Sequence, residues 1–242
     1  MHIGIISDIH GNRAALEAVL EDIQQHKCVK ILCCGDVVGY GAHPAACIEI
    51  VRTHNISCVR GNHDDFMLNS ERLAKLRKEV GDSIRWTRKQ LTEAEKQWVG
   101  TLPMQRNYAG LEFIHASHAF YPPWPYIINQ KAACANFIFQ KTRVTFHGHT
   151  HVPLLGLHKR GSLPKIMHLS QMALPPHEKC LVNVGSVGQP RDKNPDAAYA
   201  VFDMKSREFK IHRVAYDNEK AAEDIRSARL PEKFAQRLLK GR

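Results

Sequence analysis

The N-terminal part of the chain alternates short apolar runs with amphipathic stretches, and this alternation limits the possible folds more than any other feature. The apolar runs at residues 2–7, 30–34 and 57–60 are typical of buried strands. The stretches between them, at residues 14–25 and 44–54, carry apolar residues at helical spacing. Strands that alternate with helices predict βαβ units and a largely parallel sheet, so we expect an α/β fold.

The rest of the chain predicts further strands of a different kind. Residues 111–115 and 143–147 are strand-like, and residues 130–141 between them are helical. After residue 150 the chain runs through short strand-like segments that are joined by local turns and would pair antiparallel. These segments lie at about residues 154–158, 165–169, 180–184, 199–203 and 208–214.

Two helical stretches fall outside this pattern. We expect a basic helical insertion at about residues 64–103 to lie over the cleft, with Trp86 and Trp98 as packing anchors. The tail at about residues 217–242 is predicted to be helical and broken at Pro231. A proline-rich loop at residues 122–126 is stiff enough to act as a lid. No repeat or linker divides the sequence, so we expect a single domain over residues 1–242.

Composition excludes several classes of protein. No apolar run approaches the ~20 residues that cross a bilayer, so no membrane contact is expected. Because the chain begins directly with a strand-like run, we expect no signal peptide. The seven cysteines, without CxxC spacing, indicate reduced thiols and a cytoplasmic protein. The net charge of +10 suits an anionic partner. Nucleic acid is possible but not favoured, because basic and aromatic residues are not interleaved.

Metal-competent side chains follow the predicted strands where each strand ends, which is the edge at which open α/β sheets bind ligands. They are Asp8, His10, Asp36, Asn62, His63, His115, His149 and His151. Mixed nitrogen and oxygen donors suit Mn, Fe, Zn or Co better than Ca or Mg. The set is too large for one ion, and two ions bridged by one carboxylate would use it fully. Two cations ~3.5–4 Å apart clamp both oxygens of an in-line phosphoryl displacement and generate a hydroxide nucleophile.

The pair His149 and His151 is separated by one residue at the end of a predicted strand. In an extended backbone, residues i and i+2 point to the same side. Both imidazoles can therefore reach one cleft, and imidazole is the commonest metal ligand in proteins.

Five short motifs, in this order, make the sequence resemble the calcineurin-like metallophosphoesterases. They are Asp8-Ile9-His10, Gly35-Asp36, Gly61-Asn62-His63-Asp64, the strand-end His115 and Gly148-His149-Thr150-His151. A further run at residues 183–192 resembles a segment of small bacterial predicted phosphodiesterases of this family, so the resemblance covers nearly the whole chain. It implies a metallo-dependent phosphatase-like fold, a four-layer αββα sandwich of two mixed β-sheets.

The resemblance also implies a role for each matching residue. One metal ion would be bound by Asp8, His10 and His151, and the other by Asn62, His115 and His149. Asp36 would bridge both ions beside a bridging hydroxide that attacks in line. His63 would not be a ligand; it would donate a proton to the leaving group or stabilise its charge.

Three further residues are candidates for substrate contact. Asn12 either caps the helix at residues 14–25 or touches substrate. His118 competes with His115 for the ligand role, and we assign the ligand role to His115 because it follows the apolar strand directly. Arg191 either holds a substrate phosphate or forms a structural salt bridge. His147 is interpreted as a core histidine.

The predicted activity is a dinuclear-metal phosphoesterase that acts on phosphodiesters or other small phosphorylated or nucleotide substrates. The alternatives are a dinucleoside polyphosphate hydrolase, a phosphomonoesterase or phosphoprotein phosphatase, and a nuclease. In the protein-phosphatase branch a carboxylate and an arginine stand where this chain has Gly39 and Tyr40, which argues against a phosphoprotein phosphatase. Another group must then orient His63, and Asp64 is either that group or a turn cap. An inactive binding scaffold, as in the metallophosphoesterase-like retromer subunit, is the alternative outside enzymes.

Overall fold

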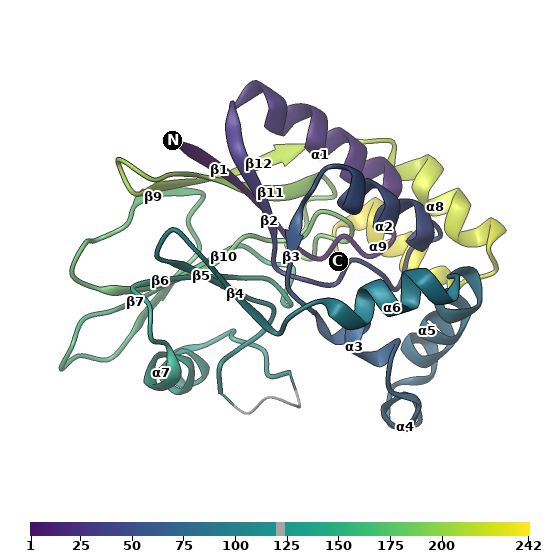
Figure 1. Cartoon of the computed structure of the whole chain (residues 1–242), viewed down its shortest axis with the longest axis horizontal. Coiled ribbons are helices and arrows are strands. Elements are labelled where there is room, and N and C mark those ends of the chain that lie inside the picture. The colour runs from purple at the N-terminus through teal and green to yellow at the C-terminus, as the bar shows by residue number, and fades with distance from the viewer. Residues whose placement is uncertain (120–123) are drawn as a thin grey trace.

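Two mixed six-stranded sheets form the centre of the computed structural model, which describes residues 1–119 and 124–242 (Figure 1). The first sheet has the order β3 (Ser57–Cys58), β2 (Cys28–Cys33), β1 (His2–Ile6), β11 (Ala197–Asp203), β12 (Glu208–Val214) and β9 (Gln171–Ala173). The second has the order β4 (Gln105–Tyr108), β5 (Leu111–Ile114), β6 (Val144–His147), β10 (Lys179–Asn183), β7 (Leu154–His158) and β8 (Lys165–Met167). In the first sheet β1, β2 and β3 are parallel, and in the second β5, β6 and β10 are parallel.

Helices cover both outer faces of the paired sheets, which confirms the predicted αββα sandwich. Helices α1 (Arg13–Gln25) and α2 (Pro44–Thr53) pack on the first sheet, and α7 (Gln130–Phe139) packs on the second (Figure 1). Strand β1 shows how the sequence builds these layers. Ile3 and Ile5 point between the sheets, while Ile6 faces α1 and α2, as the two-residue period of a strand requires. Gly4 leaves room for Ile23 of α1.

The basic stretch after β3, predicted to be a helical insertion, forms four separate helices. They are α3 (Asn62–Phe66), α4 (Ser70–Leu73), α5 (Lys78–Gln90) and α6 (Glu93–Thr101). The break between α5 and α6 occurs because Thr92 starts a new helix. Its hydroxyl accepts a hydrogen bond from the backbone N–H of Glu95, whose carboxylate accepts one from the N–H of Thr92. Trp86 and Trp98 are partly buried against the core, as expected of packing anchors.

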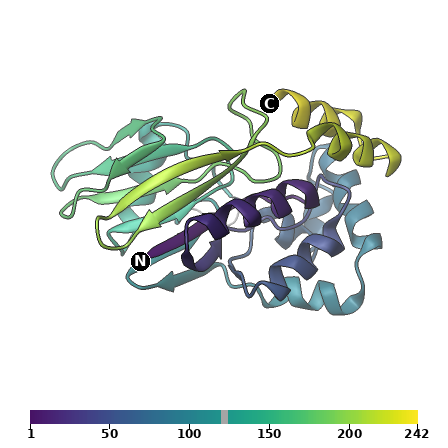
Figure 2. The ribbon, with the colours of Figure 1, turned by 90° about the horizontal axis from the view of Figure 1, so that it is seen from above.

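The C-terminal part is a helical hairpin, α8 (Asn218–Ser227) and α9 (Glu232–Lys240), divided at Pro231 as predicted. From above, the hairpin and helices α3–α6 lie at the same end of the two sheets (Figure 2). Phe234 and Leu238 of α9 belong to a small apolar cluster that includes Tyr40 from the loop after β2. The hairpin is therefore joined to a loop that carries several of the candidate site residues.

Some local features differ from the sequence-based expectations. The third strand ends at Cys58 rather than at residue 60. The reason is that the backbone N–H of Arg60 donates a hydrogen bond to the carbonyl of Pro103 and not to β2. The short strands β4 and β9 were not predicted, since β4 is a polar edge strand and β9 is an edge strand of only three residues. The proposed lid at residues 122–126 falls partly outside the described residues.

No helix in the described parts of the chain is long and apolar enough to span a membrane. All seven cysteines are free. Burial raises the pKa of Cys28 to about 11 and that of Cys180 to about 12, so these thiols stay protonated at neutral pH.

Candidate metal centre and cleft

The predicted ligands meet at one edge of the sandwich, where strands from both sheets end. Asp8 and His10 follow β1, Asp36 follows β2, and Asn62 begins α3 after β3. The second sheet supplies residues from the ends of two neighbouring parallel strands: His115, His149 and His151. All seven side chains are buried. The site forms because the carboxyl ends of parallel strands converge, as the βαβ pattern predicts.

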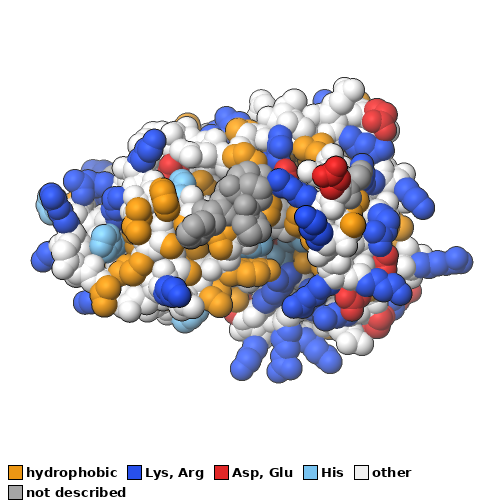
Figure 3. All heavy atoms as spheres, turned by 90° about the horizontal axis from the view of Figure 1, so that it is seen from below, with side chains coloured by type: hydrophobic (Ala, Val, Ile, Leu, Met, Phe, Trp, Pro, Cys, Tyr) orange, Lys and Arg blue, Asp and Glu red, His pale blue; other side chains and the backbone are white. Residues whose placement is uncertain are grey.

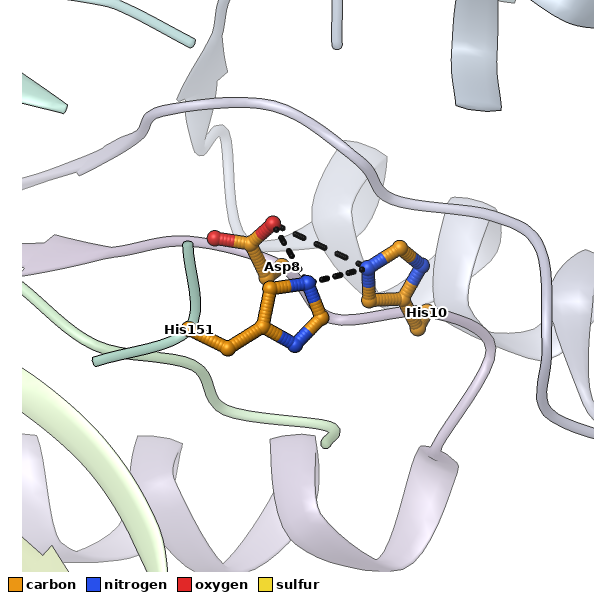
Figure 4. Close-up of side chains that lie close together, drawn as sticks. All are labelled: Asp8, His10 and His151. Carbon is orange, nitrogen blue, oxygen red and sulfur yellow. Dashed lines mark hydrogen bonds and ion pairs between the residues drawn. The ribbon is translucent and has the colours of Figure 1, made fainter. Parts of the chain in front are cut away.

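Asp8, His10 and His151 form the first group of ligand-type side chains (Figure 4). The Nε2 atoms of the two histidines are 3.1 Å apart. Asp8 Oδ1 lies 3.2 Å from His151 Nε2 and 3.7 Å from His10 Nε2. Three donor atoms from two different sheets therefore point at one small volume.

Asn62, His115 and His149 form the second group together with Asp36. His115 Nε2 lies 3.2 Å from His149 Nδ1, 3.0 Å from Asn62 Oδ1 and 3.2 Å from Asp36 Oδ2. The same Asp36 oxygen lies 3.6 Å from His10 Nε2 in the first group. Asp36 Oδ2 is thus within reach of both groups, the position that a bridging carboxylate would occupy.

Hydrogen bonds on the outer side of each ring determine which histidine nitrogens face inward as lone pairs. In the first group, the outer nitrogen of His10 faces the backbone carbonyl oxygen of Val38, and that of His151 faces the carbonyl oxygen of Gln189. In the second group, the outer nitrogen of His115 faces the carbonyl oxygen of Cys34, and that of His149 faces the carbonyl oxygen of Trp124. A carbonyl only accepts, so each outer nitrogen carries the proton, and the inner nitrogen of the neutral ring is a lone pair. Two such inner nitrogens at 3.1 Å repel each other, and a cation between them removes the repulsion.

The buried carboxylate of Asp8 supports the same conclusion. Its Oδ1 has no hydrogen-bond partner among the described residues, although the atom is fully buried. Leaving a buried charged oxygen unsatisfied is costly. The donor set of imidazole, carboxylate and amide thus fits divalent cations on the chemistry of the residues present.

The ionisation of these groups also suits cation binding. Burial lowers the pKa of His149 to about 3 and that of His151 to about 4, so both rings are neutral at neutral pH, as metal ligands must be. Burial alone would raise the pKa of Asp36, but His115 and His63 outweigh it and hold that pKa low. For His115, burial is outweighed by Asp36, and the pKa rises to about 9. A proton on His115 therefore partly balances the carboxylates where no cation does.

The backbone at this site is left-handed at five of the seven predicted ligands. The φ angles are +54° at Asp8, +51° at His10, +55° at Asp36, +68° at His149 and +60° at His151. The extended geometry expected for the last two residues is therefore wrong, and the two imidazoles enter different groups. Non-glycine residues with such angles cluster at functional sites, where surrounding contacts hold them.

Asp64 holds the ligand loops in place. From the sequence, Asp64 could either orient His63 or cap a turn. Its carboxylate accepts hydrogen bonds from the backbone N–H groups of Asp36, Val37, Val38 and Gly61, at 2.8–3.3 Å. It thereby fixes the loop after β2 to the start of α3. Its position in the first turn of a helix is the signal that could have revealed this role.

The run at residues 183–192 supports the ligand loops from the other side. Asn183 donates to the carbonyl of Gly148 and, at 3.0 Å, to the hydroxyl of Thr150. The Ser186 hydroxyl donates to the carbonyl of Asp8 at 2.9 Å. His147, the predicted core histidine, is fully buried beside Asn183, and burial lowers its pKa to about 3.

His63 lies beside both groups and is held by packing. Its ring contacts Tyr40, with ring centroids 4.3 Å apart, and His10, at 4.8 Å. A Cβ atom at Gly39 would lie 2.3 Å from His63 Nδ1, so no side chain fits at that position. Nδ1 is buried without a partner among the described residues. Glycine thus replaces the expected orienting carboxylate, and His63 is positioned by the rings around it.

The three candidates for substrate contact have different surroundings. The Asn12 side chain accepts from Ala15 N at the start of α1 and donates to the carbonyl of Gly188, so it acts as a helix cap. His118 is paired with Glu112 at 2.9 Å and is not among the described residues that line the cleft. Arg191 lines the cleft beside His63 and His151.

The cleft in front of the metal groups has a volume of about 540 Å³. Its walls combine apolar side chains with four cations, Arg72, Lys75, Arg77 and Arg191, and Asp36 is the one carboxylate in its described lining. Lys and Arg side chains also gather on the half of the lower face that carries α3–α5 (Figure 3). A cleft of this size and charge suits a small anionic molecule.

Comparisons with known proteins agree with this geometry. The family model for the calcineurin-like phosphoesterase superfamily domain matches residues 1–207. The crystal structure of a metallophosphoesterase from Sphaerobacter thermophilus is 35% identical, with full coverage of both chains and a TM-score of 0.85. An uncharacterized protein of Methanocaldococcus jannaschii is 38% identical over 244 residues, covering 99% of this chain and 98% of the relative.

A hypothetical protein from Pyrococcus horikoshii OT3 has the same fold at lower identity. Its crystal structure is 19% identical, covers 100% of this chain and 98% of its own, and gives a TM-score of 0.80. Because the family model spans most of the sequence and two relatives exceed 30% identity over their full lengths, the chain belongs to the calcineurin-like phosphoesterase superfamily.

Proposed function

We propose that this protein hydrolyses phosphoric esters, with two divalent cations held at the ends of the parallel strands. The observation that carries this proposal is the inward orientation of one ring nitrogen from each of four buried histidines beside Asp8 and Asp36. One cation would be held by Asp8, His10 and His151, and the other by Asn62, His115 and His149, with Asp36 shared. The mixed donor set favours Mn, Fe, Zn or Co. Cations bound there polarise a phosphoryl oxygen and lower the pKa of a coordinated water.

His63 is the residue that we propose acts on the leaving group. Burial lowers its pKa, so the ring is neutral at neutral pH. Because Nδ1 is buried against Gly39, Nε2 is the ring nitrogen that can face the cleft. An N–H at that position would donate a hydrogen bond to the leaving oxygen and stabilise its developing charge.

The cleft favours a phosphodiester or nucleotide-type substrate. Arg191 lies beside the metal groups and would hold a phosphate oxygen through its planar fork of N–H donors. Phe66, Leu76 and Val80 give the same cleft an apolar wall for an organic substituent on the phosphate. A dinucleoside polyphosphate is the second candidate, because Lys75 and Arg77 add cations to the lining besides Arg191, while Arg72 forms an ion pair with Asp65.

Two other expectations remain part of the proposal. An inactive scaffold is disfavoured, since a scaffold has no need for a complete ligand set and a leaving-group histidine. The seven free thiols suit a reducing compartment, and we propose the cytoplasm.

The test is hydrolysis of bis-p-nitrophenyl phosphate with added Mn²⁺, before and after treatment with a chelator. We expect turnover that the chelator abolishes. His63→Ala should lower kcat by about 10²-fold, the usual contribution of one acid–base group, while the bound metal stays unchanged. His177→Ala, which removes an exposed histidine, is the matched control.

A protein that binds metal but hydrolyses neither this diester nor p-nitrophenyl phosphate with any of Mn, Fe, Zn or Co would contradict the proposal. Loss of metal from the His63→Ala variant would assign His63 to the ligands instead.

A further inference from the structure

The C-terminal hairpin reaches the metal centre, although it lies beyond residue 207, where the match to the family model ends. Phe234 of α9 packs on the ring of Tyr40, with centroids 4.7 Å apart. Tyr40 in turn packs on His63 and on His10. One turn of α9 is therefore separated from the candidate leaving-group histidine by a single aromatic ring.

The hairpin also holds the loop that carries Arg191. The N–H of Lys193 donates to the carbonyl of Gly241, which follows α9, at 2.7 Å. Gly241 has a φ of +60°, and a Cβ atom there would lie 2.5 Å from the backbone of Asn194, so the two segments are in close contact. At the other end of this loop, the carbonyl of Gln189 accepts from Nδ1 of the candidate ligand His151.

Gln189 joins two guanidinium groups. Its Oε1 accepts a hydrogen bond from Arg191 at 2.9 Å and from Arg237 of α9 at 3.3 Å. Its own Nε2 is buried without a partner among the described residues, and the residue is only 1% exposed. One neutral amide oxygen thus holds two cations together, and a buried N–H donor beside them is left unused.

Charge around this arginine pair is not balanced within the described chain. No carboxylate of the described residues forms an ion pair with Arg191 or Arg237, although both side chains are partly buried. Burial and the neighbouring Arg191 both lower the pKa of Arg237, which reflects the repulsion between the two groups. Two guanidinium groups and a spare amide donor form a strong recognition element for a phosphate, because each guanidinium presents a planar fork of N–H donors.

Arg191 lines the cleft, Gln189 lines a second cavity, and Tyr40 lines both. The guanidinium carbon of Arg191 lies 5.6 Å from the centroid of the Tyr40 ring. That contact fixes the orientation of the guanidinium beside the metal groups. Arg237 belongs to α9 and donates to the same Gln189 oxygen as Arg191, so an anion held by both arginines would extend from the metal centre towards α9.

We propose that Arg191, Arg237 and Gln189 form an anion subsite that binds a second phosphate group of the substrate, next to the one that is attacked. The inference rests on the proposed function and adds a substrate class, esters that carry two linked phosphate groups. It also makes the hairpin a part of the substrate site, with Arg237 as a determinant of specificity.

The experiment compares inorganic pyrophosphate with inorganic phosphate as competitive inhibitors of bis-p-nitrophenyl phosphate hydrolysis by the Mn²⁺-loaded protein. Arg237→Ala should weaken inhibition by pyrophosphate about tenfold, the usual effect of losing one charged hydrogen-bond donor. Inhibition by phosphate should weaken less than about twofold, because a single phosphate binds at the position of the attacked group and leaves the second subsite empty. Arg237→Lys, which keeps the charge but loses the fork, should fall between wild type and Arg237→Ala.

Lys240→Ala is the matched control, since it removes one exposed positive charge from the same helix. All variants are measured in one buffer, so that complexation of free Mn²⁺ by pyrophosphate is common to them. If Arg237→Ala weakens both inhibitors equally, or weakens neither, the subsite is refuted. If Arg237→Ala does not fold, the ratio of the inhibition constants for phosphate and pyrophosphate is measured on Arg237→Lys, and an unchanged ratio in that variant refutes the subsite.

Failure of the proposed function would look different. If the wild-type protein does not hydrolyse the diester, calorimetric titration of the Mn²⁺-loaded protein with pyrophosphate and with phosphate still tests the subsite. Tighter binding of pyrophosphate that Arg237→Ala abolishes would uphold the subsite, and equal affinities in the two proteins would reject it.

Discussion

Asp36→Asn is expected to lower the rate of bis-p-nitrophenyl phosphate hydrolysis by at least about 10³-fold, more than the loss of one electrostatic group in an active site usually costs. The reason is that Asp36 Oδ2 lies within 3.6 Å of histidine nitrogens in both metal groups. The amide oxygen of an asparagine at this position can still accept a hydrogen bond from the backbone N–H of His63, as Asp36 Oδ1 does at 2.8 Å. Its NH₂ group, however, would donate to the imidazole lone pairs and occupy the space of the cations.

The Asp36→Asn substitution should also change how the melting temperature responds to Mn²⁺. In the wild-type protein, Mn²⁺ at about 100 times its dissociation constant should stabilise the fold by about 2.7 kcal/mol, which raises Tm by roughly 5–10 °C. In Asp36→Asn this rise should disappear, and the metal-free protein should melt below the wild-type temperature, because the ionised carboxylate, whose pKa is held low by His115 and His63, stabilises the fold at neutral pH. Differential scanning fluorimetry with and without Mn²⁺ measures both effects.

Asp203→Asn is the control for Asp36→Asn, because it makes the same change at a carboxylate that accepts from Ser206 in a turn and belongs to no group of ligand-type side chains among the described residues. A fully active Asp36→Asn enzyme that keeps its Mn²⁺-dependent rise in Tm would show that no carboxylate bridges two ions here.

Gly39→Ala is expected to have the second largest effect, a fall in kcat of roughly 10²–10³-fold. An added Cβ atom would lie 2.3 Å from His63 Nδ1, so the ring must move. A displacement of about 1 Å at a catalytic group costs on the order of 10²-fold. The same loop carries Asp36, and its movement adds to the loss.

Backbone strain alone would also disturb this variant, because Gly39 has a φ of +93°. Gly110→Ala separates the two causes. Gly110 has a similar φ of +80°, and an added Cβ atom there would meet nothing within 4 Å. Both variants should lose stability of order 1 kcal/mol from backbone strain, and Gly39→Ala should lose more because its Cβ atom also meets the buried His63 ring. Only Gly39→Ala should lose activity, and equal activities in steady-state assays would show that the packing of His63 does not matter.

The convergence of the candidate ligands could be predicted from the sequence because it follows from topology. Parallel strands present their carboxyl ends at one edge, so residues as distant as Asp8 and His151 meet without any local signal linking them. The αββα layers were predictable for the same reason, since strand and helix periods are written in the apolar pattern.

The remaining features depend on contacts that no periodicity encodes. The left-handed backbone of His149 and His151 is fixed by surrounding hydrogen bonds, so an extended geometry was the natural but wrong expectation. The contact between Tyr40 and Phe234 joins residues almost 200 positions apart in the sequence, and Phe234 lies in a C-terminal tail that carries no motif. The role of Gly39 depends on the position of the His63 ring, which the sequence does not give.

The central claim is that two cations share Asp36, and anomalous diffraction from crystals grown with Mn²⁺ tests it most directly. We predict two peaks ~3.5–4 Å apart on either side of Asp36 Oδ2. One should lie against Asp8, His10 and His151, and the other against Asn62, His115 and His149. A single peak at this site, or peaks only at the separate group Asp22, His26 and His212 between α1 and β12, would contradict the account.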